Sequence, residues 1–205
     1  ALIRNAEVLS LVNDAEKYGI STGKVKADYT VALQRSRRIV HRLTKGIASL
    51  LRKNEVKYVE GTARLVDPHT VVVGEERIEA KHVIIATGAR PQPLPGVDVD
   101  GVVVVTYREA ILQDTVPKEV VIVGGGAIGL ELGYVYNAYG ANVTVVEFEP
   151  HILPKEDEEI ATALAKALTK QGIRILASSK CASVEPQKNK AIVKIESPEG
   201  DLDVE

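Results

Sequence analysis

The spacing of apolar and polar residues predicts a strand, a helix and a second strand in the C-terminal half of the chain. Residues 120–123 are four consecutive apolar, mostly β-branched residues, as in a strand buried on both faces. A helical pattern then continues to Tyr139, and Gly140 is placed to end it. Residues 143–146 form a second apolar run that ends at Glu147. This order predicts a βαβ unit, in which a helix joins two parallel strands.

Upstream of this unit, the pattern changes from helical to strand-like. Residues 1–18 predict a helix that stops at Gly19, and residues 28–53 predict a second, longer helix. The following stretch alternates with a period of two, which is typical of an antiparallel meander. Its predicted strands are residues 57–60, 63–66, 70–73 and 77–80, followed by a buried strand at residues 82–86 that runs into Thr87 and Gly88.

The remaining segments predict a connection and a second group of strands. Residues 91–116 contain several prolines and predict a link between two domains, with a short strand and a short helix inside it. Residues 157–170 predict an amphipathic helix that ends at Gly172. Further strands are predicted at residues 173–177, 182–185 and 191–196, with another one starting before Glu205.

Three glycines follow the first strand of the βαβ unit with the spacing G-x-G-x-x-G. Gly124 would permit the tight turn out of the strand, and Gly126 would let a pyrophosphate approach the backbone. Gly129 would let the helix pack closely on the strand. The phosphates would lie at the helix N-terminus, where free N–H groups and the helix dipole favour an anion. The alternative is a glycine-rich turn in another kind of α/β protein, against which the flanking strand and helix argue.

Glu147 lies at the end of the second strand, 23 positions after Gly124. A carboxylate at this place can accept hydrogen bonds from the ribose diol of an adenosine, and it would repel a 2′-phosphate. The next residues are Phe148 and Glu149, so no arginine is present to pair with such a phosphate. The sequence therefore favours NAD over NADP.

Composition and charge narrow the possible classes of function. The 205 residues are 45% hydrophobic and 26% charged, as in a globular protein with its own core. The formal net charge is −2 and no apolar run reaches the roughly 20 residues of a membrane helix, so neither nucleic acid nor a membrane is indicated as a partner. The basic residues of the helix at residues 28–53 fit a solvated face better than a polyanion site. The single cysteine, Cys181, excludes a disulfide within the chain and fits a reducing compartment.

Five stretches of the sequence resemble the dihydrolipoamide dehydrogenases of the flavin-dependent pyridine nucleotide–disulfide oxidoreductase family. They are residues 1–7 (ALIRNAE), 42–46 (RLTKG), 60–63 (EGTA), 84–91 (IIATGARP) and 124–131 (GGGAIGLE). The resemblance covers essentially the whole chain. It implies an α/β fold with two Rossmann-like FAD/NAD(P)-binding domains and β-meanders. Residues 1–116 would be a partial FAD-binding domain, and residues 117–205 would be an NAD-binding domain truncated at its C-terminal end.

The resemblance also implies cofactor contacts, an activity and partners. The implied NAD contacts are the pyrophosphate loop of Gly124, Gly126, Ala127 and Gly129, then Ile128 and Glu131 near the nicotinamide, Glu147 at the ribose, and the backbone of Cys181 at the adenine. The implied FAD contacts are Ala63, Thr87, Gly88 and Ala89. Members of the family oxidise a dihydrolipoyl thiol pair through a redox disulfide, pass the electrons to FAD and reduce NAD⁺. The implied partners are a second copy in a homodimer and the lipoyl domains of a 2-oxo-acid dehydrogenase complex, in the cytoplasm or the mitochondrial matrix.

Several parts of the family pattern are missing from this sequence. No FAD-type G-x-G-x-x-G precedes Gly124, and the family's C-x-x-x-x-C pair would lie immediately before Ala1. The family's second flavin stretch, dimer domain and C-terminal His–Glu base would follow Glu205. The histidines at positions 41, 69, 82 and 151 match no catalytic position, so we expect neither a catalytic residue nor a metal ligand in this chain.

The absence of methionine and the uncapped first helix lead us to expect an excised piece, or the visible part of a longer protein, rather than a natural remnant. Such a chain would not perform the disulfide reaction alone, and it would hold FAD weakly or not at all. One alternative is another member of the superfamily, such as an NADH oxidase or a mercuric-type reductase. The other is a catalytically silent NAD-binding or scaffold module, which the single cysteine favours.

Overall fold

The computed structural model describes residues 1–204, which form two compact units. The first unit comprises Ala1–Arg37 and Pro91–Glu205, and the second comprises Arg38–Arg90. The sequence placed a domain boundary between residues 116 and 117, and that boundary stays a prediction. The compact units differ from the two predicted domains, because the N-terminal helix packs against the βαβ unit and so belongs to the first unit.

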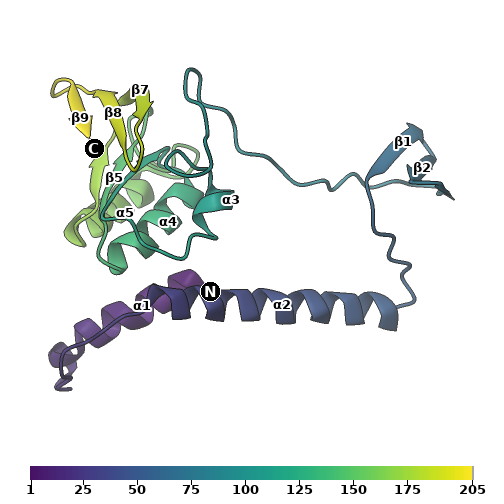
Figure 1. Cartoon of the computed structure of the whole chain (residues 1–205), viewed down its shortest axis with the longest axis horizontal. Coiled ribbons are helices and arrows are strands. Elements are labelled where there is room, and N and C mark those ends of the chain that lie inside the picture. Colours follow the sequence, from purple (N-terminus) through teal and green to yellow (C-terminus); the bar gives the residue numbers. More distant parts are fainter. Residues whose placement is uncertain (205) are drawn as a thin grey trace. The chain divides into compact units, whose positions relative to one another are not determined.

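A parallel sheet in the order β4-β5-β6 is the centre of the first unit. Strands β4 (Glu119–Val123), β5 (Asn142–Val146) and β6 (Arg174–Leu176) pair in parallel, and helix α4 (Ala127–Ala138) connects the first two. The predicted βαβ unit is therefore confirmed. Helix α5 (Glu158–Lys170) leads into β6, and Figure 1 shows it in green with α4 beside this sheet.

Burial in this sheet follows the position of each strand. The central strand β5 is buried, with Val143, Val145 and Val146 at most 2% exposed. Strand β4 pairs with β5 alone among the described strands, and its Val123 is 44% exposed. The prediction of burial on both faces therefore holds in part for β4. Val120 and Ile122 pack against the core that contains Val143, and Val121 packs on the other face against Val146. Val123, at the end of the strand, is exposed.

The N-terminal helices pack on α4 and extend the same core. Helix α1 (Leu2–Asn13) places Leu2 and Ala6 in one cluster with Leu130 of α4, and it is followed by the short helix η1 (Ala15–Tyr18). Helix α2 (Tyr29–Lys53) begins at Tyr29, whose ring meets that of Tyr139 edge-on at a centroid distance of 5.1 Å. The two predicted N-terminal helices are thus present, the first divided at Asp14.

The first unit ends in an antiparallel sheet of β7 (Lys180–Pro186), β8 (Ala191–Glu196) and β9 (Leu202–Val204), drawn in yellow-green to yellow in Figure 1. Buried Val193 and Ile195 of this sheet share a second core with Val146 of β5. The meander is thereby attached to strand β5, which Glu147 directly follows.

The second unit contains the rest of helix α2 and a three-stranded antiparallel meander. Its strands are β1 (Ala63–Asp67), β2 (Thr70–Val73) and β3 (Glu76–Glu79). Three of the predicted strands of this part are confirmed, but residues 57–60 and 82–86 form no strand. Ile84 and Ile85 are 90% and 71% exposed, and their backbone belongs to none of the described sheets.

The connecting stretch at residues 91–116 contains the short helix α3 (Tyr107–Ala110) but not the predicted strand. One Asp100 carboxylate oxygen accepts hydrogen bonds from the backbone N–H groups of Val102, Val103 and Val104 at 2.7–2.9 Å. Backbone N–H groups that are bonded to the Asp100 side chain cannot pair with another strand. The valines at residues 102–104 therefore form a bend and not a strand.

Candidate functional site

The candidate site lies where strands β4 and β5 end side by side. Val123 pairs with Val146, and the Gly124 N–H donates to the Val146 carbonyl at 2.8 Å. The glycine loop therefore leaves the sheet directly beside Glu147. This is the carboxyl edge of a parallel sheet, where α/β proteins bind nucleotides.

Each of the three motif glycines has a distinct geometry. Gly124 has φ 109°, in the left-handed region that favours glycine. A Cβ added to Gly126 would meet no atom within 4 Å, so the space beside this residue is open. A Cβ added to Gly129 would lie 2.4 Å from the Gly124 carbonyl oxygen and 2.9 Å from the Ile122 side chain. The turn and the close packing predicted for Gly124 and Gly129 are both present.

Helix α4 begins directly at this loop, without a side chain over its N-terminus. Gly126 is the N-cap residue and provides no side-chain hydrogen bond. The first-turn N–H groups have no side-chain cap from Gly126, and free N–H groups at a helix N-terminus favour an anion.

Glu147 is buried at 7% exposure beside the same loop. Its Oε2 accepts the Gly125 N–H at 2.7 Å, and its Oε1 accepts the Glu149 N–H at 2.9 Å. Its own backbone N–H donates to the Leu176 carbonyl at 2.8 Å. Backbone N–H groups thus solvate the carboxylate, and each oxygen retains a lone pair for a ribose hydroxyl.

The other predicted NAD contacts divide into a helical pair and a separate residue. Ile128 and Glu131 are exposed, Ile128 by 54%, and their spacing of three residues places them on one face of α4. Ala127 is the first residue of this helix and is exposed as well. The structure therefore gathers Ala127, Ile128 and Glu131 at the start of α4, beside the glycine loop.

Cys181 lies in strand β7, two residues after a residue that contacts Glu147. The Ser179 N–H donates to the Glu147 carbonyl at 2.9 Å, two residues before Cys181. The thiol packs in the second core with Val146, and burial raises its pKa above the ordinary value. A thiol with this pKa is little ionised at neutral pH, as expected of a structural cysteine.

The predicted flavin residues are not gathered into a cradle in the second unit. Ala63 begins strand β1, whereas Thr87, Gly88 and Ala89 follow the exposed stretch at residues 82–86, and all four are exposed. Rossmann cradles form where a buried strand ends, and the strand that would end at Thr87 is missing. The residues of this unit, as they are arranged here, do not fit a flavin.

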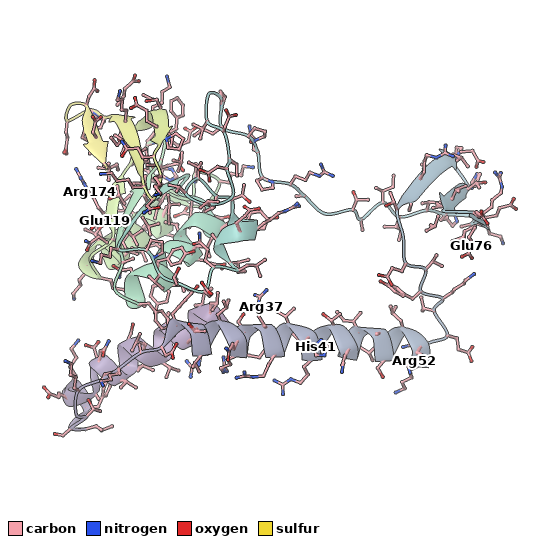
Figure 2. All side chains as sticks on the ribbon, in the orientation of Figure 1. Arg37, His41, Arg52, Glu76, Glu119 and Arg174 are labelled. Atoms are coloured by element: carbon pink, nitrogen blue, oxygen red, sulfur yellow. The ribbon has the colours of Figure 1, made fainter. Side chains whose placement is uncertain are left out.

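The basic side chains of helix α2 lie largely on an exposed surface. Figure 2 labels Arg37, His41 and Arg52 along helix α2, and the helix from residue 38 onward is almost entirely exposed. Within residues 1–204 no group of three acidic, histidine or cysteine side chains is arranged to hold a metal ion. No helix in this range is both long and apolar enough to span a bilayer.

The sequence analysis missed the residues that hold the glycine loop from behind. A Cβ at Gly125 would lie 2.9 Å from the Ile152 side chain, and the Gly125 carbonyl accepts the Leu153 N–H at 2.9 Å. The available signals were a fourth glycine within the motif, to which no role had been assigned, and an Ile-Leu pair between two prolines.

Comparison with known proteins gives consistent matches over nearly the full chain. Residues 5–204 match the model of the pyridine nucleotide-disulphide oxidoreductase family. A dihydrolipoyl dehydrogenase of Rhizobium etli is 38% identical, over 98% of this chain and 46% of the relative. That of Zymomonas mobilis is 40% identical, over 98% and 44%, and the mitochondrial one of Schizosaccharomyces pombe is 36% identical, over 96% and 40%. The chain thus spans less than half the length of these relatives.

Solved structures agree with this fold. LpdA of Mycobacterium tuberculosis superposes with a TM-score of 0.83 at 24% identity, over 98% of this chain and 45% of that one. The flavoprotein disulfide reductase RclA of Escherichia coli gives a TM-score of 0.73 at 24% identity, over 99% and 43%. From the family match and the identity to these relatives, the chain belongs to the pyridine nucleotide–disulfide oxidoreductase family.

Proposed function

We propose that this chain is the NAD-binding part of an NAD-dependent dihydrolipoyl dehydrogenase. The observation that supports this most directly is the open glycine cradle at the N-terminus of α4, beside the buried carboxylate of Glu147. Bound NAD⁺ supplies a nicotinamide ring that accepts hydride. The residues described here bind and orient the nucleotide.

We assign roles to the chain's residues from the geometry of the glycine loop and from the family resemblance. The N–H groups of the first turn of α4 hold the pyrophosphate, which the missing Cβ of Gly126 admits to the backbone. Glu147 accepts hydrogen bonds from the adenosine ribose and disfavours a 2′-phosphate. Ile128 and Glu131 face the nicotinamide half from the exposed side of α4, and the backbone of Cys181 contacts the adenine.

For the whole protein we propose oxidation of a dihydrolipoyl thiol pair with FAD and NAD⁺. The family match and the names of the relatives support this proposal. Ala63, Thr87, Gly88 and Ala89 would contact the flavin only in an arrangement different from the exposed one seen here. A homodimer, the lipoyl domains of a 2-oxo-acid dehydrogenase complex, and a location in the cytoplasm or the mitochondrial matrix follow from the same resemblance.

A second candidate function is a catalytically silent NAD-binding module. It is favoured by the single cysteine, which is half-buried and therefore a poor partner for dithiol exchange. The two candidates share the NAD site and differ in whether dihydrolipoamide is oxidised.

Calorimetric titration of the full chain with NAD⁺ tests the shared site. Gly126→Val should abolish measurable binding, because the side chain fills the open space beside the loop. Gly23→Val is the matched control, since a side chain at Gly23 also meets no atom within 4 Å and lies far along the chain from the loop. Retained NAD⁺ affinity in Gly126→Val would show that the pyrophosphate lies elsewhere.

A further inference from the structure

Gly125 is held on three sides although the motif assigns it no role. Its N–H donates to Glu147 Oε2 at 2.7 Å, and its carbonyl accepts the Leu153 N–H at 2.9 Å. An added Cβ would lie 2.9 Å from Ile152 Cγ2 and 3.1 Å from Glu147 Oε2. The backbone N–H and the carbonyl of Gly125 are therefore both hydrogen-bonded, and the position where a side chain would start is closed off. All three contacts come from residues that follow strand β5 in the sequence.

The segment that reaches Gly125 is itself anchored. Ile152 is 1% exposed and belongs to the core that includes Val143 and Val145. Leu153 has φ 50°, a left-handed backbone conformation that a leucine keeps only where its surroundings hold it. This conformation is the one in which Leu153 presents its N–H to Gly125 while Ile152 stays in the core.

We propose that Ile152 and Leu153 form a latch that positions the pyrophosphate loop before any nucleotide binds, with Gly125 as its contact point. Gly126 follows Gly125 directly, so fixing both polar groups of Gly125 also fixes the backbone that the pyrophosphate approaches. This inference rests on the proposed NAD binding. Ile152 and Leu153 are positioning residues, because they act on the nucleotide only through the glycine loop. A loop already in its binding conformation loses less freedom on binding, so the latch increases affinity.

Ile152→Ala tests the latch against a matched core variant, Ile173→Ala. Both isoleucines are 1% exposed and lie in the same core, so both variants should lose comparable stability toward urea. Only Ile152→Ala should raise the dissociation constant for NAD⁺, by about tenfold. It alone should also speed hydrogen exchange of the Gly125 amide in the nucleotide-free chain.

Whereas Ile152→Ala removes atoms from the contact, Gly125→Ala tests the same contact by adding atoms to it. Its methyl group should displace Ile152 or Glu147 and weaken NAD⁺ binding, and Ile152→Ala should recover part of this loss by removing the atom nearest to the methyl. Equal NAD⁺ affinity and equal Gly125 exchange in Ile152→Ala and Ile173→Ala would overturn the latch. Absence of NAD⁺ binding by the unaltered chain would instead overturn the proposed function, while amide exchange would still decide whether Gly125 is held.

Discussion

At the residue scale, the carboxylate of Glu147 holds the glycine loop through the Gly125 N–H, and we propose that it also selects NAD⁺ over NADP⁺. Glu147→Arg should weaken NAD⁺ binding by about ten- to a hundredfold, because a hydrogen bond to a charged group and the Gly125 acceptor are lost together. The ratio of the dissociation constants for NAD⁺ and NADP⁺ should shift toward NADP⁺, since the arginine can pair with a 2′-phosphate. Glu149→Arg makes the same charge change on an exposed neighbour and should shift the ratio less. An unchanged ratio in Glu147→Arg would remove the ribose assignment.

The raised pKa of buried Tyr136 leads us to expect that the folded chain loses stability at alkaline pH. Tyr136 is 4% exposed, its hydroxyl donates to the Ala110 carbonyl at 2.9 Å, and burial, aided by the Tyr29 phenol, raises its pKa to about 12. The phenol ionises near pH 10 in the unfolded chain but only near pH 12 in the folded chain. The contribution of Tyr136 to the free energy of unfolding is therefore complete below pH 10 and is lost between pH 10 and about 12. The free energy of unfolding should fall by at most about 3 kcal/mol, because each pKa unit corresponds to about 1.4 kcal/mol.

Urea unfolding at pH values from 9 to 11.5 measures this slope. Tyr136→Phe should flatten it at the cost of lower stability at neutral pH, because the hydroxyl that bonds Ala110 is gone. Tyr58→Phe removes a phenol that is 72% exposed and should keep the original slope. A Tyr136→Phe profile parallel to that of the unaltered chain would refute this account.

The parts of the candidate site that could be predicted from the sequence are those where the backbone conformation or packing allows only one type of residue. Gly124 and Gly129 are required by a left-handed turn and by a close approach of helix to strand, and both requirements depend on neighbouring residues. Glu147 was predictable because it directly follows a buried strand. The contact of Gly125 with Ile152 joins positions that are distant along the chain, and no periodicity or motif spacing encodes it.

At the element scale, the structure shows that Asp157 is the N-cap of helix α5. One Asp157 carboxylate oxygen accepts the N–H groups of Glu159 and Ile160 at 3.0 and 3.3 Å. Asp157→Ala should lower the free energy of unfolding by about 1 kcal/mol, because these donors lose their partner. Glu156→Ala removes the same charge one residue earlier and should change stability much less. Equal effects in urea denaturation would show that charge, not capping, stabilises this end.

Elements failed to form as predicted where an apolar run had no partner. The apolar run at residues 82–86 has the composition of a buried strand, yet Ile84 and Ile85 are exposed and unpaired by any described strand. Residues 142–146 have the same kind of composition and form the central strand β5, because β4 and β6 flank it. Composition therefore predicts the ability to form a strand, and the neighbours decide whether it forms.

At the scale of the whole molecule, the two units lead to opposite expectations for the two cofactors. The first unit presents an open glycine loop at the N-terminus of α4, the proposed NAD site, whereas the predicted flavin contacts of the second unit are exposed and no buried strand among the described residues supports them. The chain expressed as the 205 residues of this sequence should therefore purify without a flavin absorption band and still bind NAD⁺. The measurement is a visible spectrum recorded together with the intact mass, which should be near 22.1 kDa. A stoichiometric flavin band at this mass would show that residues 38–90 adopt a flavin-binding arrangement on their own.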